Sequence, residues 1–408
     1  MEEILVAAGE ASGDRAAASA LAELPGVRSY GLGGSALQGL GTELVADLRR
    51  TTGMGITEVA TSVPRLLYLL HALEREAIRR RTKVALLVNY SDFNVRLGHR
   101  LRKAGVKVLF YGPPQVWAWR SGRAAEVARS ADVVATMLPF EAPLWRAFGV
   151  TAKYVGHPSL EHLPMPRDAA RARLDLTDRA FAVGILPGSR REEVTRLLPA
   201  MLDGYVVARK EHATVDGRVF LAPSLDADTT RFLRREAKLR NVPVVAIDAR
   251  EGALPMLSAF DATFCASGTA SLEAAVANAV PVVAYKVSLV TELVGRALLS
   301  VDHVALPNLI VGRRAFCELL QRDVTPRKLY RALREVMRKR EHYMDACAEV
   351  RARLGEDHRP SSKVAAILAE WLPAAVRSGV LPLPDVGAPL DNAGDPLRTM
   401  GEPLPGAG

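Results

Sequence analysis

Short apolar runs alternate with longer segments of helical periodicity from the beginning of the chain. The runs at 4–8, 84–88, 106–111 and 133–137 are predicted strands, and 14–23 is a predicted helix. The strands are largely apolar rather than alternating, which is typical of a parallel sheet covered by helices on both faces. The first part of the chain is therefore predicted to be a doubly wound α/β domain.

The same pattern restarts beyond residue 180. Five further apolar runs predict a second parallel sheet, at 181–185, 219–221, 244–247, 263–265 and 280–285. Residues 162–179, which carry two prolines and then a charged helix, are interpreted as the region that links the two sheets. Two such domains facing each other would form a cleft, with ligands at the carboxyl ends of the strands.

These patterns divide the chain into three parts. Residues 1–163 are predicted to form one domain, and residues 164–372 a second domain that includes the C-terminal helices expected after Thr325. Residues 373–408 are rich in Pro, Gly and Ala, so they bury too little apolar surface to offset the entropy lost on ordering. We predict that this last part is a disordered tail.

Composition narrows the class of protein. The 408 residues are 49% hydrophobic and 24% charged, which are globular values. The three cysteines, Cys265, Cys317 and Cys347, lie far apart, which excludes a disulfide scaffold and a zinc ribbon. No apolar run is long enough for a transmembrane helix, and the acidic N-terminus is unlike a secretory signal. We expect a cytoplasmic protein.

Basic residues are concentrated in one segment. Between Arg65 and Arg129, fourteen Lys and Arg residues stand against four Asp and Glu, so this segment supplies the whole net charge of +9. Such a segment suggests an anionic partner, which can be a phosphate ligand, a nucleic acid or an anionic lipid. Solvated helix faces rich in arginine are the alternative, to which we give equal weight.

Two loops of the predicted first domain carry candidate catalytic carboxylates. Glu10 lies in the glycine-flanked turn after the first strand, where Ser12 or Asp14 is expected to cap the next helix. Asp92 follows a later strand, and a carboxylate in a cleft can take a proton from an attacking hydroxyl. Alternatively, Glu10 faces solvent and Asp92 caps the helix that begins near Asn94.

Two loops of the predicted second domain suit a phosphate. Gly188, Ser189 and Arg190 combine close approach of the backbone, a helix N-terminus and a bidentate donor for diphosphate oxygens. The loop 266–273 places small and hydroxyl-bearing residues at another helix start. Glu273 there could accept both hydroxyls of a ribose, or merely complement the helix dipole. Neither a nicotinamide fingerprint nor a P-loop is present.

Three other features have weaker interpretations. Asp226 and Asp228 match the short D-x-D metal pattern of some glycosyltransferases, but they lie at a predicted helix start, so no metal site is predicted. His157 is interpreted as structural. Trp117 and Trp119 either stack on sugars or pack the wall of the cleft.

Eight motifs, in their order along the chain, resemble those of one family. They are GEASGD at 9–14, SDFN at 91–94, QVWAWR at 115–120, GHP at 156–158, LPGSR at 186–190, SGTA at 267–270, LPNL at 306–309 and ELLQ at 318–321. Together they resemble the lipid-A-disaccharide synthases, inverting glycosyltransferases of Gram-negative lipid A and lipopolysaccharide synthesis. The resemblance extends from Ile4 to Trp371.

The resemblance implies a GT-B fold of two Rossmann-like domains facing across a cleft, the N-terminal one towards acceptor and membrane and the C-terminal one holding UDP. It implies transfer from UDP-2,3-diacylglucosamine to 2,3-diacylglucosamine 1-phosphate (lipid X), with inversion, a β(1→6) link and release of UDP. No metal or other cofactor is implied. Carried over by motif, the UDP-sugar residues are Gly188, Ser189, Arg190, Ser267, Gly268, Thr269, Glu273 and Asn308.

The resemblance places Glu10 and Asp92 on the acceptor side, where an inverting transfer needs a base for the acceptor hydroxyl. Asp92 is the preferred general base and Glu10 the alternative, while Ser12, Asn94, Trp117 and Trp119 are expected to line the acceptor side. Two other functions stay open at this point. One is another UDP-sugar glycosyltransferase or epimerase, and the other is a non-catalytic UDP-sugar or nucleic-acid binder.

Acylated substrates require access to a membrane. Residues 63–83 carry an apolar stripe beside a basic cluster, which is typical of a helix at an anionic membrane surface. The predicted membrane residues are Leu66, Leu67, Leu70, Arg79, Arg80 and Arg81. A buried interdomain helix is the alternative. We expect a peripheral protein on the cytoplasmic face of the inner membrane, without a nucleic-acid partner and with homodimer formation left open.

Overall fold

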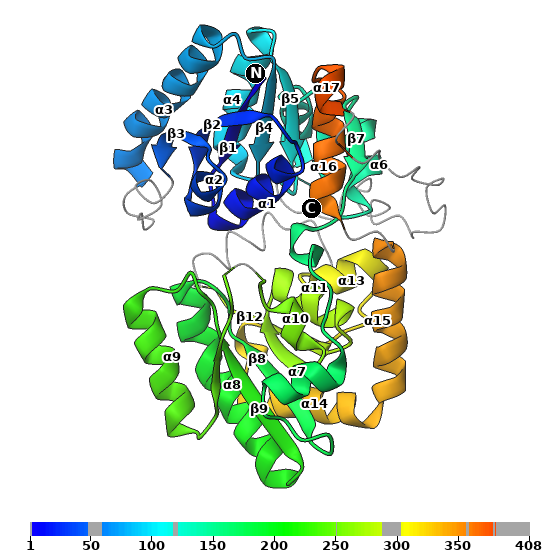
Figure 1. Ribbon diagram of the computed structural model, residues 1–408. Helices are drawn as coiled ribbons and strands as arrows, with labels where there is room; N and C mark the ends of the chain where they lie inside the picture. Colours follow the sequence, from blue (N-terminus) through cyan, green and yellow to red (C-terminus); the bar gives the residue numbers. More distant parts are fainter. Residues whose placement is uncertain are drawn as a thin grey trace, which may run out of the picture. The chain divides into compact units, whose positions relative to one another are not determined.

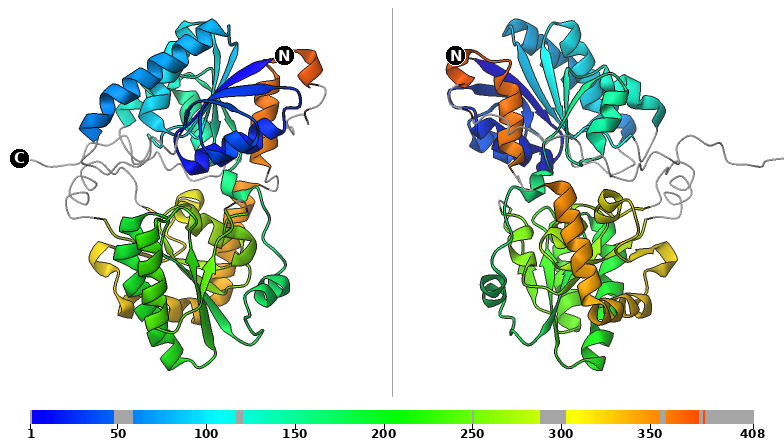
Figure 2. Two further views of the ribbon diagram at one scale, coloured as in Figure 1. Left: turned by 60° about the vertical axis from the view of Figure 1, so that its left-hand side comes forward. Right: turned by 90° about the vertical axis from the view of Figure 1, so that its right-hand side faces the viewer.

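A computed structural model describes residues 2–47, 59–116, 121–249, 251–287, 303–355, 359–377 and 380. The chain divides into two compact units. The first unit comprises Met1–Glu161 and His358–Leu390, and the second comprises His162–Asp357 and Asp391–Gly408. Each unit contains a parallel sheet with helices on both faces (Figure 1, Figure 2). The prediction of two Rossmann-like α/β domains is confirmed, and the division after Glu161 lies two residues before the predicted one.

The first unit has a seven-stranded sheet in the order β3-β2-β1-β4-β5-β6-β7. Its strands are β1 Glu3–Ala8, β2 Arg28–Gly33, β3 Glu43–Asp47, β4 Val84–Val88, β5 Lys107–Tyr111, β6 Val133–Thr136 and β7 Thr151–Tyr154. Its helices are α1 Ala11–Ala22, α2 Ser35–Gly39, α3 Val59–Arg79, α4 Ser91–Lys103, α5 Ala124–Ala128, α6 Glu141–Ala147, α16 Pro360–Ala369 and α17 Ala374–Arg377. The four predicted strands are present. Strands β2, β3 and β7 were not predicted, because they lie towards the two sides of the sheet and are less uniformly apolar.

Helix α1 begins at Ala11, three residues before the predicted start, and Asp14 does not cap it. The buried Asp14 carboxylate instead accepts the N–H groups of Gly34 at 2.7 Å, Ala36 at 2.8 Å and Leu37 at 3.3 Å. These groups belong to the start of α2, where a helix leaves N–H donors without partners in its own turn. The predicted capping of α1 by Ser12 or Asp14 is therefore wrong, because Asp14 satisfies a neighbouring helix.

The C-terminal helices are shared between the two units. Helices α14 (Pro326–Arg338) and α15 (Arg340–Leu354) belong to the second unit, whereas α16 and α17 belong to the first. Assigning all of these helices to the second domain was wrong. Val364, Ile367 and Leu368 of α16 are buried in the core of the first sheet, and α16 lies beside α1 (Figure 1). The physical reason is that this face of the sheet needs an apolar cover.

The prediction of a tail beginning at Pro373 needs a related correction. Residues Ala374–Arg377 form α17, and Val376 joins the same core. The rest of the predicted tail, apart from Val380, which packs against this core, lies outside the described residues.

The second unit has a six-stranded sheet in the order β10-β9-β8-β11-β12-β13. Its strands are β8 Phe181–Leu186, β9 Val215–Leu221, β10 Val244–Ala246, β11 Ala262–Ala266, β12 Val280–Tyr285 and β13 Glu318–Leu320. Besides α14 and α15, its helices are α7 Arg167–Arg173, α8 Arg191–Glu211, α9 Ala227–Leu239, α10 Leu254–Leu257, α11 Thr269–Val276 and α13 Leu306–Val311. All five predicted strands are present. The sixth, β13, coincides with a family motif that was not recognised as a strand.

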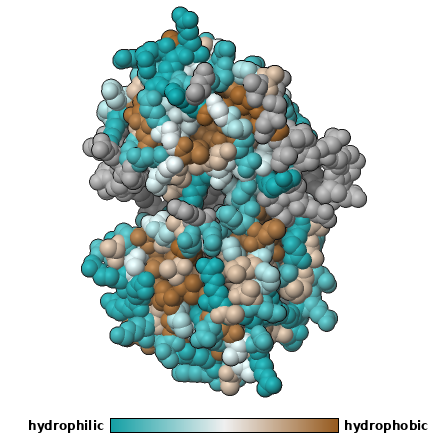
Figure 3. Space-filling model, viewed as in Figure 1, coloured by the Kyte–Doolittle hydropathy of each residue, from teal (hydrophilic) through white to brown (hydrophobic). Residues whose placement is uncertain are grey.

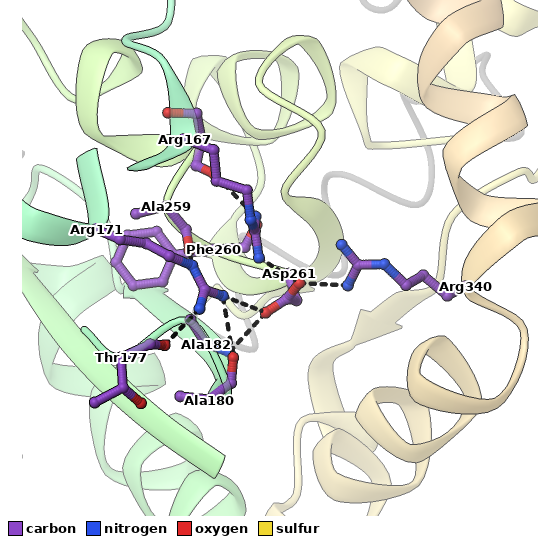
Figure 4. A network of polar contacts seen from close by, with 10 residues as sticks. Arg167, Arg171, Thr177, Ala180, Ala182, Ala259, Phe260, Asp261 and Arg340 are labelled. Carbon is purple, nitrogen blue, oxygen red and sulfur yellow. Dashed lines mark hydrogen bonds and ion pairs between the residues drawn. The ribbon is translucent and has the colours of Figure 1, made fainter. Parts of the chain in front are cut away.

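Three arginines converge on the buried carboxylate of Asp261 at the amino end of β11 (Figure 4). Arg167 donates to Oδ1 at 2.7 Å, Arg171 donates to Oδ2 at 2.9 Å, and Arg340 of α15 also pairs with Oδ1. The N–H of Ala182 in β8 donates to Oδ2 at 2.8 Å. This cluster ties α7, in the predicted linker region, to the sheet and to α15.

Candidate functional site

The first candidate loops meet at the carboxyl edge of the first sheet. Strand order reverses between β1 and β4, which is the switch point at which doubly wound sheets bind ligands. Ala8 pairs with Val88, and Val88 pairs with Tyr111, so the loops after β1, β4 and β5 leave the sheet side by side. The turn that carries Glu10 therefore neighbours the β4–α4 turn that carries Asp92.

Both candidate carboxylates are accessible at this edge. Glu10 is the N-cap residue of α1, its side chain is exposed, and it makes no capping hydrogen bond. Asp92 lies in the first turn of α4, its side chain is 68% exposed, and it pairs with the guanidinium of Arg123. The alternative prediction, that Asp92 is the N-cap residue of the helix, is wrong, because Tyr90 is the N-cap residue of α4. Ser12 is exposed in the first turn of α1.

Asn94 has a structural position, contrary to the acceptor-side role expected for it. Its side chain is fully buried, and Nδ2 lies within hydrogen-bond distance of the carbonyl oxygens of Ala7, Val88 and Asn89, at 3.1, 3.2 and 2.9 Å. The amide thereby joins the ends of β1 and β4. Trp117 and Trp119, also expected on the acceptor side, lie outside the described residues.

The predicted phosphate loops meet at the carboxyl edge of the second sheet, where strand order again reverses, between β8 and β11. Leu186 pairs with Cys265, and Ala266 pairs with Ala284, so the loops after β8, β11 and β12 are neighbours. The composition of two of these loops suggests a phosphate site in each, and the family resemblance implies that both surround UDP. Sheet register supplies the geometric reason.

Arg190 projects from the first of these loops, with 75% of its side chain exposed. Its partner, Glu193, was not predicted. The carboxylate of Glu193 accepts the N–H groups of Ser189 at 3.0 Å and Arg190 at 3.3 Å, and pairs with the Arg190 guanidinium at 3.1 Å. Burial raises the pKa of Tyr285 at the end of β12, with the nearby Glu193 adding to this rise and Arg190 opposing it. Glu193 lies three residues after the N-cap residue Arg190, from where a glutamate side chain can reach back to the N-cap N–H, and this spacing could have revealed it.

Gly188 has a φ of 116°, in the left-handed region that favours glycine, and a Cβ there would meet the Glu193 side chain at 2.4–2.6 Å. The second loop resembles the first in its use of glycine: Gly268, with a φ of 141°, is the N-cap residue of α11. Thr269 begins that helix and is exposed, and Glu273 lies a turn further on and is half-buried. The Ser267 hydroxyl donates to the Val304 carbonyl at 2.7 Å, which anchors this loop to the start of α13.

Asn308, expected to contact UDP, is instead fully buried. Its Oδ1 accepts the N–H groups of Ala315 at 3.0 Å and Phe316 at 2.8 Å. Its Nδ2 donates to the Phe316 carbonyl at 3.0 Å and to the Glu318 carboxylate at 2.8 Å. All four hydrogen-bonding positions of the amide are used within the protein, so direct ligand contact is excluded in this structure.

The two last family motifs therefore brace one another. Glu318 also accepts the N–H of Ala305 at 3.0 Å and that of Val304, the residue that anchors Ser267, at 3.3 Å. Gln321 accepts the N–H of Val287 at 2.9 Å, just beyond β12. Both motifs support the backbone behind the candidate phosphate loops.

The remaining sequence features have structural roles. Asp226 caps α9 by accepting the Thr229 N–H at 2.7 Å, and Asp228 pairs with Arg231. His157 Nδ1 accepts the Ser159 N–H at 3.2 Å, and burial lowers the pKa of this imidazole to about 4. In the described part of the chain, no group of three or more His, Cys, Asp and Glu residues is arranged to hold a metal ion.

The predicted membrane residues, on α3 and just beyond its end at Arg79, separate into two groups by their exposure. Leu67 is 40% exposed, whereas Leu70 is 2% exposed and packs inwards. Arg79 is exposed, but the Arg80 guanidinium pairs with Glu3, Glu43 and Glu76 and lies 4.3 Å from the ring centre of Tyr30. The membrane roles predicted for Leu70 and Arg80 are therefore wrong, because both are held by the fold of the first unit. Leu66 is half-buried, and Arg81 is exposed.

The family model for lipid-A-disaccharide synthetase matches residues 4–369. The chain belongs to the lipid-A-disaccharide synthase family. The lipid-A-disaccharide synthase of Myxococcus xanthus (strain DK1622) is 41% identical over 381 residues, which cover 91% of this chain and 97% of that protein. That of Anaeromyxobacter sp. (strain K) is 39% identical over 368 residues, 88% of this chain and 95% of that protein.

Solved structures agree with the fold predicted for a lipid-A-disaccharide synthase. MurG of Acinetobacter baumannii has a TM-score of 0.57 at 15% identity, covering 91% of this chain and all of that one. The S. aureus MnaA structure with UDP has a TM-score of 0.59 at 12% identity, covering 91% and 97%. At these identities the likeness shows the fold alone. Family and fold together confirm the GT-B class and identify the chain as a glycosyltransferase, so the epimerase and non-catalytic alternatives are not favoured.

Proposed function

We propose that this chain condenses UDP-2,3-diacylglucosamine with 2,3-diacylglucosamine 1-phosphate to form the β(1→6) lipid A disaccharide 1-phosphate and UDP. Membership of the lipid-A-disaccharide synthase family carries this proposal. The paired phosphate-type loops on the second unit support it, because a UDP-sugar donor needs such a site. We assign donor binding to the second unit and acceptor binding to the first.

The diphosphate is assigned to the loops at Gly188–Arg190 and Ser267–Thr269. In the structure, the Glu193 carboxylate occupies the two backbone N–H groups and the guanidinium that a phosphate would use. Because the Arg190 side chain is largely exposed, it can turn from Glu193 to a diphosphate at little cost in packing. Its planar group can then bind two phosphate oxygens and compensate the charge that develops on the leaving UDP.

The transfer needs a base on the acceptor side. The acceptor 6-hydroxyl attacks the anomeric carbon from the face opposite UDP, the new C–O bond forms, and the electron pair of the breaking bond leaves with the UDP oxygen. We propose that Asp92 takes the hydroxyl proton and that Glu10 is the alternative base. Exposure of both carboxylates at the carboxyl edge of the first sheet supports these assignments.

We propose that the reaction needs no metal ion. Arg190 and the N-termini of α8 and α11 supply positive charge where a cation would otherwise act. Activity should therefore persist when EDTA is added in excess. Loss of activity with EDTA and recovery with Mg²⁺ would contradict this proposal.

We propose peripheral binding to anionic membrane on the cytoplasmic face of the inner membrane, through the exposed part of α3. No described helix is long and apolar enough to cross a membrane. The surface in Figure 3 is largely polar, with apolar residues gathered in separate patches. On α3, Leu67 and the 75%-exposed Tyr68 provide apolar side chains, while Arg79 at its end and Arg81 just beyond it provide charge.

Vesicle flotation tests the membrane proposal. Replacing Leu67 and Tyr68 together by Ser should remove most binding to vesicles that contain phosphatidylglycerol. The matched control replaces the exposed Leu239 of α9 by Ser, which should leave binding unchanged. Equal flotation of both variants and the wild type would place the membrane contact elsewhere.

The reaction itself is tested by measuring release of UDP from the acylated donor, with and without the acylated acceptor, together with mass spectrometry of the product. We expect UDP release that depends on the acceptor and a disaccharide monophosphate product. Release of UDP without a disaccharide would contradict the proposed function. Turnover of a non-acylated UDP-sugar at an equal rate would instead favour a different glycosyltransferase.

A further inference from the structure

An unusual backbone conformation marks the turn between β4 and α4. Asn89 and Tyr90 are consecutive, and both lie in the left-handed region, with φ values of 50° and 49°. Asparagine tolerates this region, but a bulky aromatic residue adopts it only at a cost in free energy. Such strain persists where the surrounding structure enforces it, and it is concentrated at functional sites.

The strained conformation directs the Tyr90 ring onto the neighbouring loop. The ring lies directly against the backbone of Gly9, because a Cβ added at Gly9 would be 1.9 Å from Tyr90 Cγ. On another side, the ring contacts Phe93, with centroids 5.1 Å apart. Burial raises the pKa of the Tyr90 phenol, and the charge of nearby Glu10 raises it further. Tyr90 therefore lies beside the candidate catalytic carboxylate of Glu10, and its side chain is only half-buried.

The turn is stabilised by hydrogen bonds that do not involve the Tyr90 side chain. Buried Asn94 donates to the Asn89 carbonyl at 2.9 Å, and the Asn89 N–H donates to the Tyr111 carbonyl at 3.0 Å. Within the described part of the chain, the Tyr90 hydroxyl has no hydrogen-bond partner. The protein thus stabilises a strained turn whose visible result is an aromatic ring placed on Gly9, next to Glu10.

We propose that Tyr90 is a substrate-contacting residue that stacks on the glucosamine ring of the acceptor and positions its 6-hydroxyl near the catalytic carboxylates. This inference rests on the proposed function. An aromatic ring suits a sugar, because its flat face covers the apolar C–H face of the pyranose. Glycine at position 9 is then needed because any side chain would displace the ring.

Three variants separate this role from a structural one. Tyr90→Phe keeps the ring and loses only the hydroxyl. Tyr90→Asn removes the ring but is tolerated in the left-handed region, so the turn should be retained. Tyr330→Asn is the matched control, because it removes another half-buried tyrosine from α14, outside the candidate loops.

The measurements are the KM for detergent-dispersed acylated acceptor, the KM for the donor, and the melting temperature. For Tyr90→Asn we expect the acceptor KM to rise about five- to tenfold, with the donor KM and melting temperature close to wild type. Tyr90→Phe and the Tyr330 control should leave both KM values within about twofold.

Two results would overturn the proposal. An unchanged acceptor KM in folded Tyr90→Asn would mean that the ring does not contact the acceptor. Equal rises in the acceptor KM and the donor KM would also overturn the proposal, because the effect would not be specific to the acceptor. If Tyr90→Asn melts early, Tyr90→Leu, which keeps an apolar side chain on Gly9, replaces it under the same criteria. A wild-type protein that forms no disaccharide would instead refute the proposed function itself, and this inference with it.

Discussion

Replacing Asn308 by Ala distinguishes a ligand-binding motif from a structural one. In the structure, the amide accepts two backbone N–H groups, from Ala315 and Phe316, and donates to the Phe316 carbonyl and to Glu318. Asn308 is fully buried, so water cannot replace the lost partners without entering the core. Alanine leaves the N–H groups of Ala315 and Phe316 without acceptors, and the buried Glu318 carboxylate loses one of its hydrogen-bond donors.

The expected cost follows from those groups. Each buried donor or acceptor left without a partner costs about 1–3 kcal/mol. With two N–H groups orphaned and the bond to Glu318 lost, we expect the free energy of unfolding to fall by about 3–5 kcal/mol. Urea titration followed by circular dichroism measures this loss from the midpoint and slope of the unfolding transition. UDP affinity, measured by calorimetry below that transition, should change only a few-fold.

Arg190→Ala is the matched control for Asn308→Ala, because it should affect donor use and not stability. Its side chain is exposed and, among the described residues, is paired with Glu193, so stability should change by less than about 1 kcal/mol. Loss of a charge-assisted bond to the diphosphate should weaken use of the donor by about 2–4 kcal/mol of transition-state stabilisation. The reasoning would be refuted if Asn308→Ala kept its stability while losing UDP affinity more than about tenfold, because the amide would then contact the nucleotide.

Two further predictions concern the base and the arginine cluster. Asp92→Asn should lower kcat by about 10²–10⁴ with UDP affinity unchanged, measured by acceptor-dependent UDP release; a kcat within about tenfold of wild type would pass the base role to Glu10. Asp261→Ala should lower the free energy of unfolding by about 3–5 kcal/mol, because it leaves three guanidinium groups and the Ala182 N–H without their carboxylate. The control, Asp228→Ala, breaks an exposed pair and should cost less than about 1 kcal/mol by the same denaturation assay, and equal losses would contradict the assigned role of the cluster.

The loops that carry candidate chemistry were predictable because they depend on local sequence. Uniformly apolar strands such as 84–88 and 181–185 are recognisable by period and length, and each is followed by a glycine-, hydroxyl- or acid-bearing turn. Parallel sheets place these turns at one edge, so strand assignment was enough to group Glu10 with Asp92 and Arg190 with Ser267. The family motifs then supplied the reaction class.

The roles of individual polar residues depended on partners far along the chain. Asp14 looked like a cap for its own helix and caps another, twenty residues on. Arg80 belonged to a basic run in the sequence, yet besides Glu76, four residues before it, it pairs with Glu3 and Glu43 of two distant strands. Periodicity does not report such contacts, because it describes which way a side chain faces and not what it meets there.

The sequence by itself determined the two sheets, the family and the loops where chemistry is expected, since apolar patterning and motif order are properties of neighbouring residues. Only the tertiary structure decided which motif residues face a ligand and which hold the backbone behind it, as Asn308 and Asn94 do. It also decided that α16 returns to the first unit, where its apolar face completes the core around β1 and β4. The physical reason is common to these cases: burial and hydrogen bonding are settled by which segments pack together, and a single chain carries that information only once it is folded.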